Sequence, residues 1–157
     1  MLCLSNGNAA GLGRTREKEL ELSCKKLGFS EAPTCIDDPE LQDGMDKQWA
    51  PELVASYIEK FCKQKETNEG PEGKINMIVT FDEHGVSYHP NHQAVHRGAE
   101  YLMTKQLVEV ELLTLCTVTL IRKYIGFIDI LLIWITQWHA FRYNFYDAYQ
   151  TLALHES

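Results

Sequence analysis

Short apolar runs alternate with amphipathic stretches along the first 120 residues of the chain. The apolar runs predict strands at 2–5, 34–36, 75–81 and 112–120. Apolar residues at helical spacing predict helices at 14–27, 51–63 and 90–105. The segments 37–48 and 64–74 are polar or charged and predict surface loops. Strands that alternate with helices form βαβ units, so the pattern predicts an α/β fold with a mostly parallel sheet flanked by helices.

Two of these elements carry specific burial predictions. The helix at 14–27 has an apolar stripe of Leu20, Cys24 and Leu27, which we expect to face the core. The run at 75–81 is almost entirely apolar, as expected for a buried parallel strand.

Length and composition narrow the class of protein. The chain has 157 residues, of which 45% are hydrophobic, and a formal net charge of −7. This length fits one globular domain spanning 1–157. The acidic balance argues against nucleic acid as a partner, because such binders carry a basic stripe. The five cysteines lack CxxC spacing and lie in apolar contexts, which is typical of free thiols in a reducing compartment.

The strongly apolar part of the chain is the tail at 125–138. Charged residues interrupt the longer segment 107–138, so no run reaches the roughly 20 apolar residues that a membrane-spanning helix needs. The stretch 130–138 has no charged side chain and carries Trp134 and Trp138. Two interpretations stay open: this stretch packs on the sheet, or it lies on a membrane surface with its tryptophans at the headgroup level.

The candidate chemistry is concentrated between the predicted strand at 75–81 and the helix that Pro90 opens. Four histidines lie there within thirteen residues, together with two carboxylates; they are His84, His89, His92 and His96, with Asp82 and Glu83. Open α/β sheets place ligands at the carboxyl ends of their strands. Histidine is the commonest metal ligand, so the cluster predicts that at least one of these residues binds zinc. No glutamate follows His92 as an HExxH motif would require.

A second motif suggests a different function. Gly7, Gly11 and Gly13 lie between a predicted strand and a helix, which is where a dinucleotide-binding turn is found. Tyr101 and Lys105 have the spacing of the catalytic pair of short-chain dehydrogenases. The chain is shorter than such enzymes, and the dehydrogenase reading leaves the histidine cluster without a role, so it remains the remote alternative.

The histidine segment also resembles a known family, the N-acetylglucosaminyl-phosphatidylinositol de-N-acetylases, which are LmbE-like zinc deacetylases. The block that carries the resemblance runs from Val79-Thr80-Phe81-Asp82 through Gly85-Val86-Ser87 to His89-x-Asn91-His92. Further similar stretches are 2–8, Gly11-Leu12-Gly13 with Arg16, 37–44 with Asp43, 122–124 and 137–143. The resemblance therefore covers most of the chain.

The resemblance implies a Rossmann-like fold, a zinc cofactor and a role for four residues. His92 would be a zinc ligand, and His89, as an imidazolium, would be the catalytic residue that stabilises the oxyanion. Arg16 and Asp43 would contact the sugar of the substrate. The implied reaction is removal of the N-acetyl group from N-acetylglucosaminyl-phosphatidylinositol in GPI-anchor biosynthesis, on the cytosolic face of the endoplasmic reticulum. The implied partners are this glycophosphoinositide lipid and the membrane surface.

One part of the family pattern is expected ahead of Leu2. There a His-Pro-Asp-Asp motif would supply two zinc ligands and the general base, on a first strand that we expect to be missing from this chain. The family also carries extra residues near 130–137. A catalytic zinc normally has three protein ligands, so His92 alone cannot hold it, and His89, His96 and Asp82 are candidates for a weak surrogate site. Two hypotheses follow: an enzyme of this family, or a catalytically inactive fragment or isoform.

Overall fold

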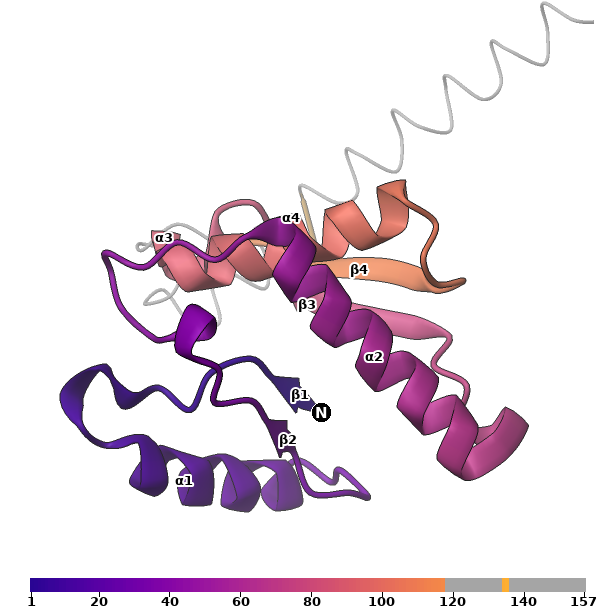
Figure 1. The fold of residues 1–157 in the computed structure, drawn as a ribbon, viewed down its shortest axis with the longest axis horizontal. Helices are drawn as coiled ribbons and strands as arrows, with labels where there is room; N and C mark the ends of the chain where they lie inside the picture. Colours follow the sequence, from indigo (N-terminus) through magenta and orange to yellow (C-terminus); the bar gives the residue numbers. More distant parts are fainter. Residues whose placement is uncertain (118–133, 136–157) are drawn as a thin grey trace, which may run out of the picture. The chain divides into compact units, whose positions relative to one another are not determined.

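The computed structural model describes residues 1–117 and 134–135. The chain divides into two compact units, 1–117 and 118–157, and the elements below belong to the first. In chain order they are β1 (Leu2–Cys3), η1 (Asn8–Ala10), α1 (Gly13–Lys26), β2 (Thr34–Cys35), η2 (Pro39–Leu41), α2 (Pro51–Glu69), η3 (Gly70–Gly73), β3 (Met77–Phe81), α3 (Gly85–Tyr88), α4 (Pro90–Thr104) and β4 (Glu111–Leu115). Strands and helices alternate as predicted, which confirms the α/β class (Figure 1).

The strands pair in parallel, again as predicted. β1 pairs with β2, with Leu2 opposite Thr34, and β3 pairs with β4, with Met77 opposite Glu111. Within residues 1–117 these are two separate parallel pairs, whereas the sequence pattern predicted one sheet. β1 is only two residues long and is hydrogen-bonded to β2, not to β3.

The closest helix packing joins α2 to α4. Gly98 of α4 lies directly against Val54 of α2: a Cβ atom placed on Gly98 would be 2.2 Å from Cγ1 of Val54. Only glycine permits this approach, which brings the two apolar helix faces together. The buried core forms around this contact and also takes in side chains next to β1 and η2. Its buried members are Leu4, Leu41, Trp49, Val54, Ala55, Ile58, Cys62, Ala94, Ala99 and Leu102.

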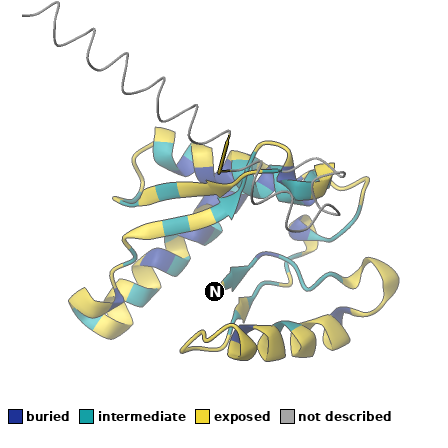
Figure 2. Cartoon of the chain, turned by 180° about the vertical axis from the view of Figure 1, so that it is seen from behind, coloured by how far each residue is buried: buried dark blue, intermediate teal, exposed yellow. Residues whose placement is uncertain are grey.

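The helix α1 covers almost the predicted range but buries little of its predicted stripe. Most of α1 is exposed (Figure 2). Cys24 is buried and Leu20 is half-buried, whereas Leu27 is 75% exposed. The expectation for Leu27 is therefore wrong. Leu27 is the C-cap residue of α1 and its N–H still bonds the carbonyl oxygen of Ser23, so it keeps its place on the helix; its exposure shows that the described residues leave this end of the stripe uncovered.

Two further expectations are wrong in their extent. The predicted loop at 64–74 is instead the last turns of α2 followed by η3, because this stretch is rich in good helix formers and Lys65 pairs with Glu69 at i,i+4. The strand β3 is not buried on both faces: Met77 and Val79 are exposed, while Ile78 packs on the core. In the described residues the helices that pack against β3 cover one face of it.

No helix among the described residues is long and apolar enough to cross a membrane. The end of the predicted strand at 118–120, and most of the apolar tail, lie outside the described residues. Trp134 and Ile135 are described, and they are helical and exposed.

Candidate functional site

The histidine segment folds as a tight turn between β3 and α4. After Phe81 the chain forms the single-turn helix α3, in which Gly85, Val86 and Tyr88 all have positive φ, at 60°, 64° and 60°. A β-branched residue such as valine rarely adopts this conformation, which costs about 1–3 kcal/mol and persists only where surrounding contacts enforce it. Pro90 then occupies the first turn of α4, where its missing N–H costs nothing.

His92 is held by the turn that precedes it. Its Nδ1 atom lies 2.9 Å from the carbonyl oxygen of Gly85, and its ring stacks on Phe81 with centroids 4.2 Å apart and an interplanar angle of 9°. A carbonyl oxygen only accepts hydrogen bonds, so Nδ1 carries the proton and Nε2 has the free lone pair. This arrangement is typical of a histidine that binds a metal, because the second nitrogen fixes the tautomer and the ring direction.

His89 lies next to His92, with the ring centroids 5.1 Å apart. Its Nδ1 atom accepts a hydrogen bond from the backbone N–H of Asn91 at 3.3 Å, which caps α4. This bond uses the lone pair of Nδ1, so the structure favours the neutral ring with its proton on Nε2. The expected imidazolium form would break this cap. Nε2 lies 3.9 Å from Oδ1 of Asp43 and so remains able to donate elsewhere.

Asp43 and Arg16 meet at Gly7. A Cβ atom on Gly7 would lie 2.8 Å from Cδ of Arg16 and 4.0 Å from Oδ2 of Asp43. Oδ1 of Asp43 also accepts a hydrogen bond from Nδ2 of Asn91 at 3.0 Å. The four residues that the sequence singled out thus form one connected set of near neighbours: Arg16 and Asp43 both lie beside Gly7, Asp43 lies near His89, and His89 lies beside His92.

Asp82 and Thr117 join the start of this turn to the residues after β4. Oδ1 of Asp82 accepts hydrogen bonds from the backbone N–H groups of His84 (3.1 Å) and Gly85 (3.0 Å) and from Oγ1 of Thr117 (2.6 Å). Oδ2 accepts from the backbone N–H of Thr117, and Oγ1 of Thr117 accepts from the N–H of Val86 at 2.9 Å. The Thr117 hydroxyl, followed by the backbone donors, lowers the pKa of Asp82 to about 2.

The other two histidines do not converge with His92 on a common centre. His84 lies beside Glu83 and the ring of Tyr88. His96 directs Nδ1 at the carbonyl oxygen of Phe81 (3.1 Å) and Nε2 at Glu100 (3.4 Å). In the part of the chain that the structure describes, no group of three or more His, Cys, Asp or Glu side chains is arranged to hold a metal ion. The surrogate site considered from the sequence, with His96 and Asp82, does not form there.

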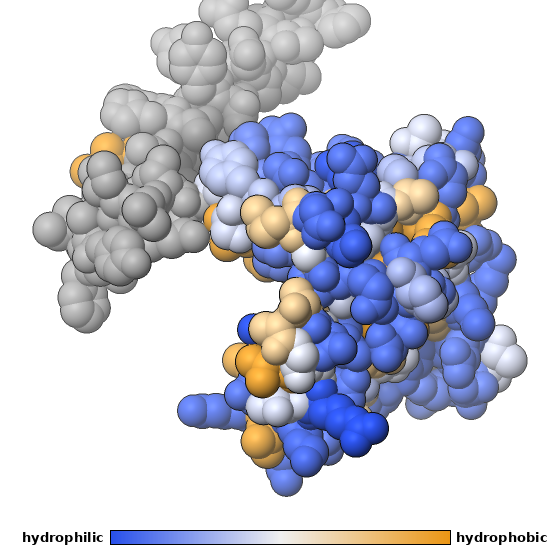
Figure 3. Space-filling model, turned by 60° about the vertical axis from the view of Figure 1, so that its left-hand side comes forward, coloured by the Kyte–Doolittle hydropathy of each residue, from blue (hydrophilic) through white to orange (hydrophobic). Residues whose placement is uncertain are grey.

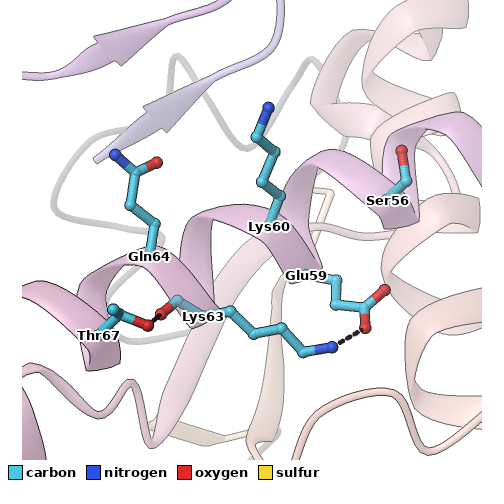
Figure 4. Close-up of a pocket in the computed structure, with 6 residues that line it drawn as sticks. All are labelled: Ser56, Glu59, Lys60, Lys63, Gln64 and Thr67. Atoms are coloured by element: carbon cyan, nitrogen blue, oxygen red, sulfur yellow. Dashed lines mark hydrogen bonds and ion pairs between the residues drawn. The ribbon is translucent and has the colours of Figure 1, made fainter.

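Two hollows on the surface of the described residues are not lined by the four candidate residues. One, of about 620 Å³, lies along α2 and is lined by Ser56, Glu59, Lys60, Lys63, Gln64 and Thr67 (Figure 4). Lys63 pairs with Glu59, while Lys60 and Gln64 extend away from this pair (Figure 4). A second, of about 690 Å³, is lined by Gln48, Trp49, Ala50, Pro51, Pro90, Gln93 and Arg97. Neither contains a residue that the sequence analysis assigned to the site.

Sequence reasoning missed three parts of the site: Asn91 as the link to Asp43, Thr117 as the partner of Asp82, and the Gly85 carbonyl. A local signal existed only for the turn that contains Gly85. An aspartate three residues before a glycine is typical of a turn in which the side chain accepts backbone N–H groups, which is what Asp82 does. The partnership with Thr117 spans 35 residues and has no local signature.

The dehydrogenase alternative loses support in the structure. Tyr101 packs against the buried core, and Lys105 lies over the face of its ring, with Nζ 5.6 Å from the ring centroid. Gly7 lies against the side chain of Arg16, which occupies the space beside the glycine turn.

Comparison with known proteins gives consistent results. The family model PIG-L, described as GlcNAc-PI de-N-acetylase, matches residues 1–103. A probable N-acetylglucosaminyl-phosphatidylinositol de-N-acetylase of Schizosaccharomyces pombe is 39% identical over 130 residues, which cover 82% of this chain and 49% of that protein. Its counterpart in Dictyostelium discoideum is 35% identical, covering 82% of this chain and 57% of that protein. The N-acetylglucosaminyl-phosphatidylinositol de-N-acetylase of Bos taurus is 34% identical, and the match covers 83% of this chain and 49% of that protein.

The chain spans about half the length of the curated relatives it matches. No solved structure matches it.

Proposed function

Because this chain belongs to the GlcNAc-PI de-N-acetylase family, we propose that it carries the histidine part of an active site that deacetylates N-acetylglucosaminyl-phosphatidylinositol. In this hydrolysis the oxygen of water bonds to the acetyl carbon, and the carbon–nitrogen bond breaks. Acetate leaves, and the sugar keeps a free amine. The product belongs to the biosynthesis of GPI anchors.

His92 is the zinc ligand in this proposal. The single observation that carries the proposal is the Gly85 carbonyl on Nδ1 of His92, which leaves Nε2 available to a metal. A zinc ion bound there would polarise the amide carbonyl and activate water near neutral pH. His92 fits one position of such a site, and the remaining ligands and general base would come from the His-Pro-Asp-Asp segment of the family.

His89 is the oxyanion donor. Its Nε2–H is not hydrogen-bonded to Asp43, since the two atoms are 3.9 Å apart, so it is available to the oxygen that becomes negative during the reaction. The neutral tautomer serves this purpose and keeps the Nδ1 cap on Asn91.

Asp43 and Arg16 hold the sugar. A carboxylate accepts hydrogen bonds from sugar hydroxyls and a guanidinium donates them, so the pair recognises both sides of a hydroxyl. Asp43 is fixed by the amide of Asn91, and Arg16 lies across Gly7 beside it. The sugar would then lie next to His89, with its acetamido group toward His92.

The test compares the chain alone with the chain carrying a His-Pro-Asp-Asp segment of the family joined ahead of Met1, using acetate release from the glycolipid. We expect turnover from the extended protein only. His92→Ala should lose zinc, which is measured as the zinc content of the purified protein by elemental mass spectrometry. His89→Ala should keep zinc but slow turnover by about 10²- to 10³-fold, as for one lost oxyanion donor.

The matched control is His84→Ala, because His84 is exposed and lies outside the connected set. Normal zinc content in the His92 variant would show that the ligand is wrong. A folded extended protein without turnover would favour the inactive fragment. Zinc-dependent turnover by the chain alone would contradict the need for ligands outside it.

The proposal includes action at a membrane, on the cytosolic face of the endoplasmic reticulum, because the substrate is a lipid. The face seen in Figure 3 is mostly hydrophilic over the described elements, so this face is a poor candidate for contact with the membrane. The segment 130–138 is the candidate, since Trp134 and Ile135 are 66% and 48% exposed.

Flotation with phosphatidylinositol-containing vesicles tests this membrane contact. Replacing Trp134 and Ile135 together by serine should weaken binding, whereas Leu27→Ser removes a more exposed apolar side chain elsewhere and should not. Equal binding by all three proteins would exclude this segment as the contact.

A further inference from the structure

The contacts around Asp82 reach further than a simple turn requires. Its carboxylate binds the backbone of the turn at His84 and Gly85 and, through Thr117, the chain that follows β4. The Thr117 hydroxyl donates to Asp82 and accepts from the N–H of Val86, so both of its hydrogen-bonding roles are used between the two segments.

These contacts fix the part of the turn that meets His92. Gly85 donates its N–H to Asp82 and presents its carbonyl oxygen to Nδ1 of His92. The backbone of this single residue therefore links the Asp82 and His92 side chains. Val86, immediately after Gly85, has φ 64°, which a valine adopts only when its surroundings enforce it. The hydroxyl of Thr117 is the group that binds the Val86 N–H.

We propose that Asp82 and Thr117 are positioning residues for His92: they hold the turn so that the Gly85 carbonyl fixes the tautomer and direction of the imidazole. This inference rests on the proposed function, in which His92 binds zinc through Nε2. Neither residue touches the metal or the substrate in this scheme. Their effect reaches His92 only through the backbone of Gly85.

A purely structural role for Thr117 would predict something different. It would predict lower stability without a change in the His92 ring of the folded protein. A positioning role predicts that the His92 tautomer changes while the protein stays folded. Asp82 is suited to such a role because its lowered pKa, about 2, keeps it an acceptor for all its donors at working pH.

The test is nitrogen-15 NMR of the histidine side chains in the chain as it stands, about two pH units above the usual histidine pKa. A His92→Gln variant assigns the signal. The wild type should show His92 with its proton on Nδ1. Thr117→Val, which keeps the shape and removes the hydroxyl, should shift His92 toward a mixture of both tautomers, whereas Thr117→Ser should restore the wild-type signal.

Thr114→Val is the matched control, since Thr114 is an exposed residue of β4 whose hydroxyl has no contact with the turn among the described residues. Asp82→Asn is the second variant: it keeps an acceptor for the turn but places an amide donor against Thr117. A folded Thr117→Val or Asp82→Asn protein with the wild-type His92 signal overturns the proposal.

Amide hydrogen exchange in the wild type gives a measurement that needs no variant. Gly85 and Val86 should exchange slowly, because both N–H groups are bound by the Asp82–Thr117 pair. Exchange as fast as that of the exposed neighbours would overturn the proposal.

Zinc binding by the extended protein separates this inference from the proposed function. Thr117→Val should weaken zinc binding by about 10- to 100-fold, the usual effect of losing an outer-shell partner. If the tautomer responds to Thr117 but the extended protein neither binds zinc nor turns over, the positioning holds and the proposed function fails. If zinc and turnover are normal in Thr117→Val and the tautomer is unchanged, the positioning fails alone.

Discussion

A Cβ atom on Gly85 would lie 2.7 Å from Cβ of His92, so the turn and the helix that carries the candidate zinc ligand leave no room for a side chain between them. Gly85 also has φ +60°, which L-residues with a side chain adopt at a cost. Two independent reasons therefore require glycine at this position.

Gly85→Ala should destabilise the chain by about 1–3 kcal/mol and displace His92 from the Gly85 carbonyl. Denaturant unfolding measures the first effect, and the nitrogen-15 signal of His92 measures the second. Gly11→Ala is the control, because Gly11 has a similar φ of +72° with nothing within 4 Å of its Cβ position. It should lose stability without altering His92. An unchanged His92 signal in a folded Gly85→Ala protein would contradict this prediction.

Gly98 should also not tolerate a side chain, because it packs directly against Val54. Gly98→Ala places a methyl group 2.2 Å from Cγ1 of Val54, so the helices must separate, at a cost of about 1–3 kcal/mol. The double variant Gly98→Ala with Val54→Ala removes the nearest atom, Cγ1, and leaves Cβ of Val54 at 2.5 Å, so it should recover part of the loss, measured by chemical denaturation. If the two substitutions are simply additive, the contact between α2 and α4 is not the cause.

The stability of the chain should fall in acid partly through Asp82. Its pKa is lowered to about 2, so its contribution to the free energy of unfolding is complete above the unfolded value of about 3.9 and is lost as pH falls toward 2. Unfolding measured from about pH 5 to about pH 2 should therefore show a shallower loss for Asp82→Asn than for the wild type. Asp38 and Glu31 also have lowered pKa values but are present in both proteins, so the difference isolates Asp82. Parallel curves would contradict the assignment.

The cysteines should differ in reactivity. Burial, with a contribution from the neighbouring Cys3, raises the pKa of Cys35 to about 12, so it remains a poorly reactive thiol at about pH 9. Cys116 is exposed and should be alkylated first, with the sites identified by mass spectrometry. All five cysteines should react in denaturant. Equal rates for Cys35 and Cys116 in the native chain would show that β2 is not packed as described.

The positions of the helices and strands could be predicted from the sequence, because the residues that begin an element lie within it or beside it. Pro51 and Pro90 begin α2 and α4 as predicted, since proline suits the first turn of a helix. The predictions failed where tertiary contact decides the outcome: the described residues leave Leu27, at the end of α1, and Val79, in β3, exposed.

Some residues of the candidate site could be predicted from the sequence, and others depend on tertiary contacts. The resemblance selected His89, His92, Arg16 and Asp43, and the structure places these four residues near one another, with Arg16 and Asp43 beside Gly7. Their roles stay predictions until the proposed assays are done. The Asp82–Thr117 pair could not be predicted, because it depends on where β4 ends beside the turn and not on any spacing within the sequence.

The acceptors that orient both His92 and His96 are main-chain carbonyls, those of Gly85 and Phe81. A main-chain oxygen is present whatever residue occupies the position, so no side-chain substitution deletes either acceptor; substitutions act only by moving the backbone. Transfer of this turn to another β-strand–helix junction should therefore carry the imidazole orientation with it, provided that the path from 81 to 85 is kept and a hydroxyl takes the place of Thr117.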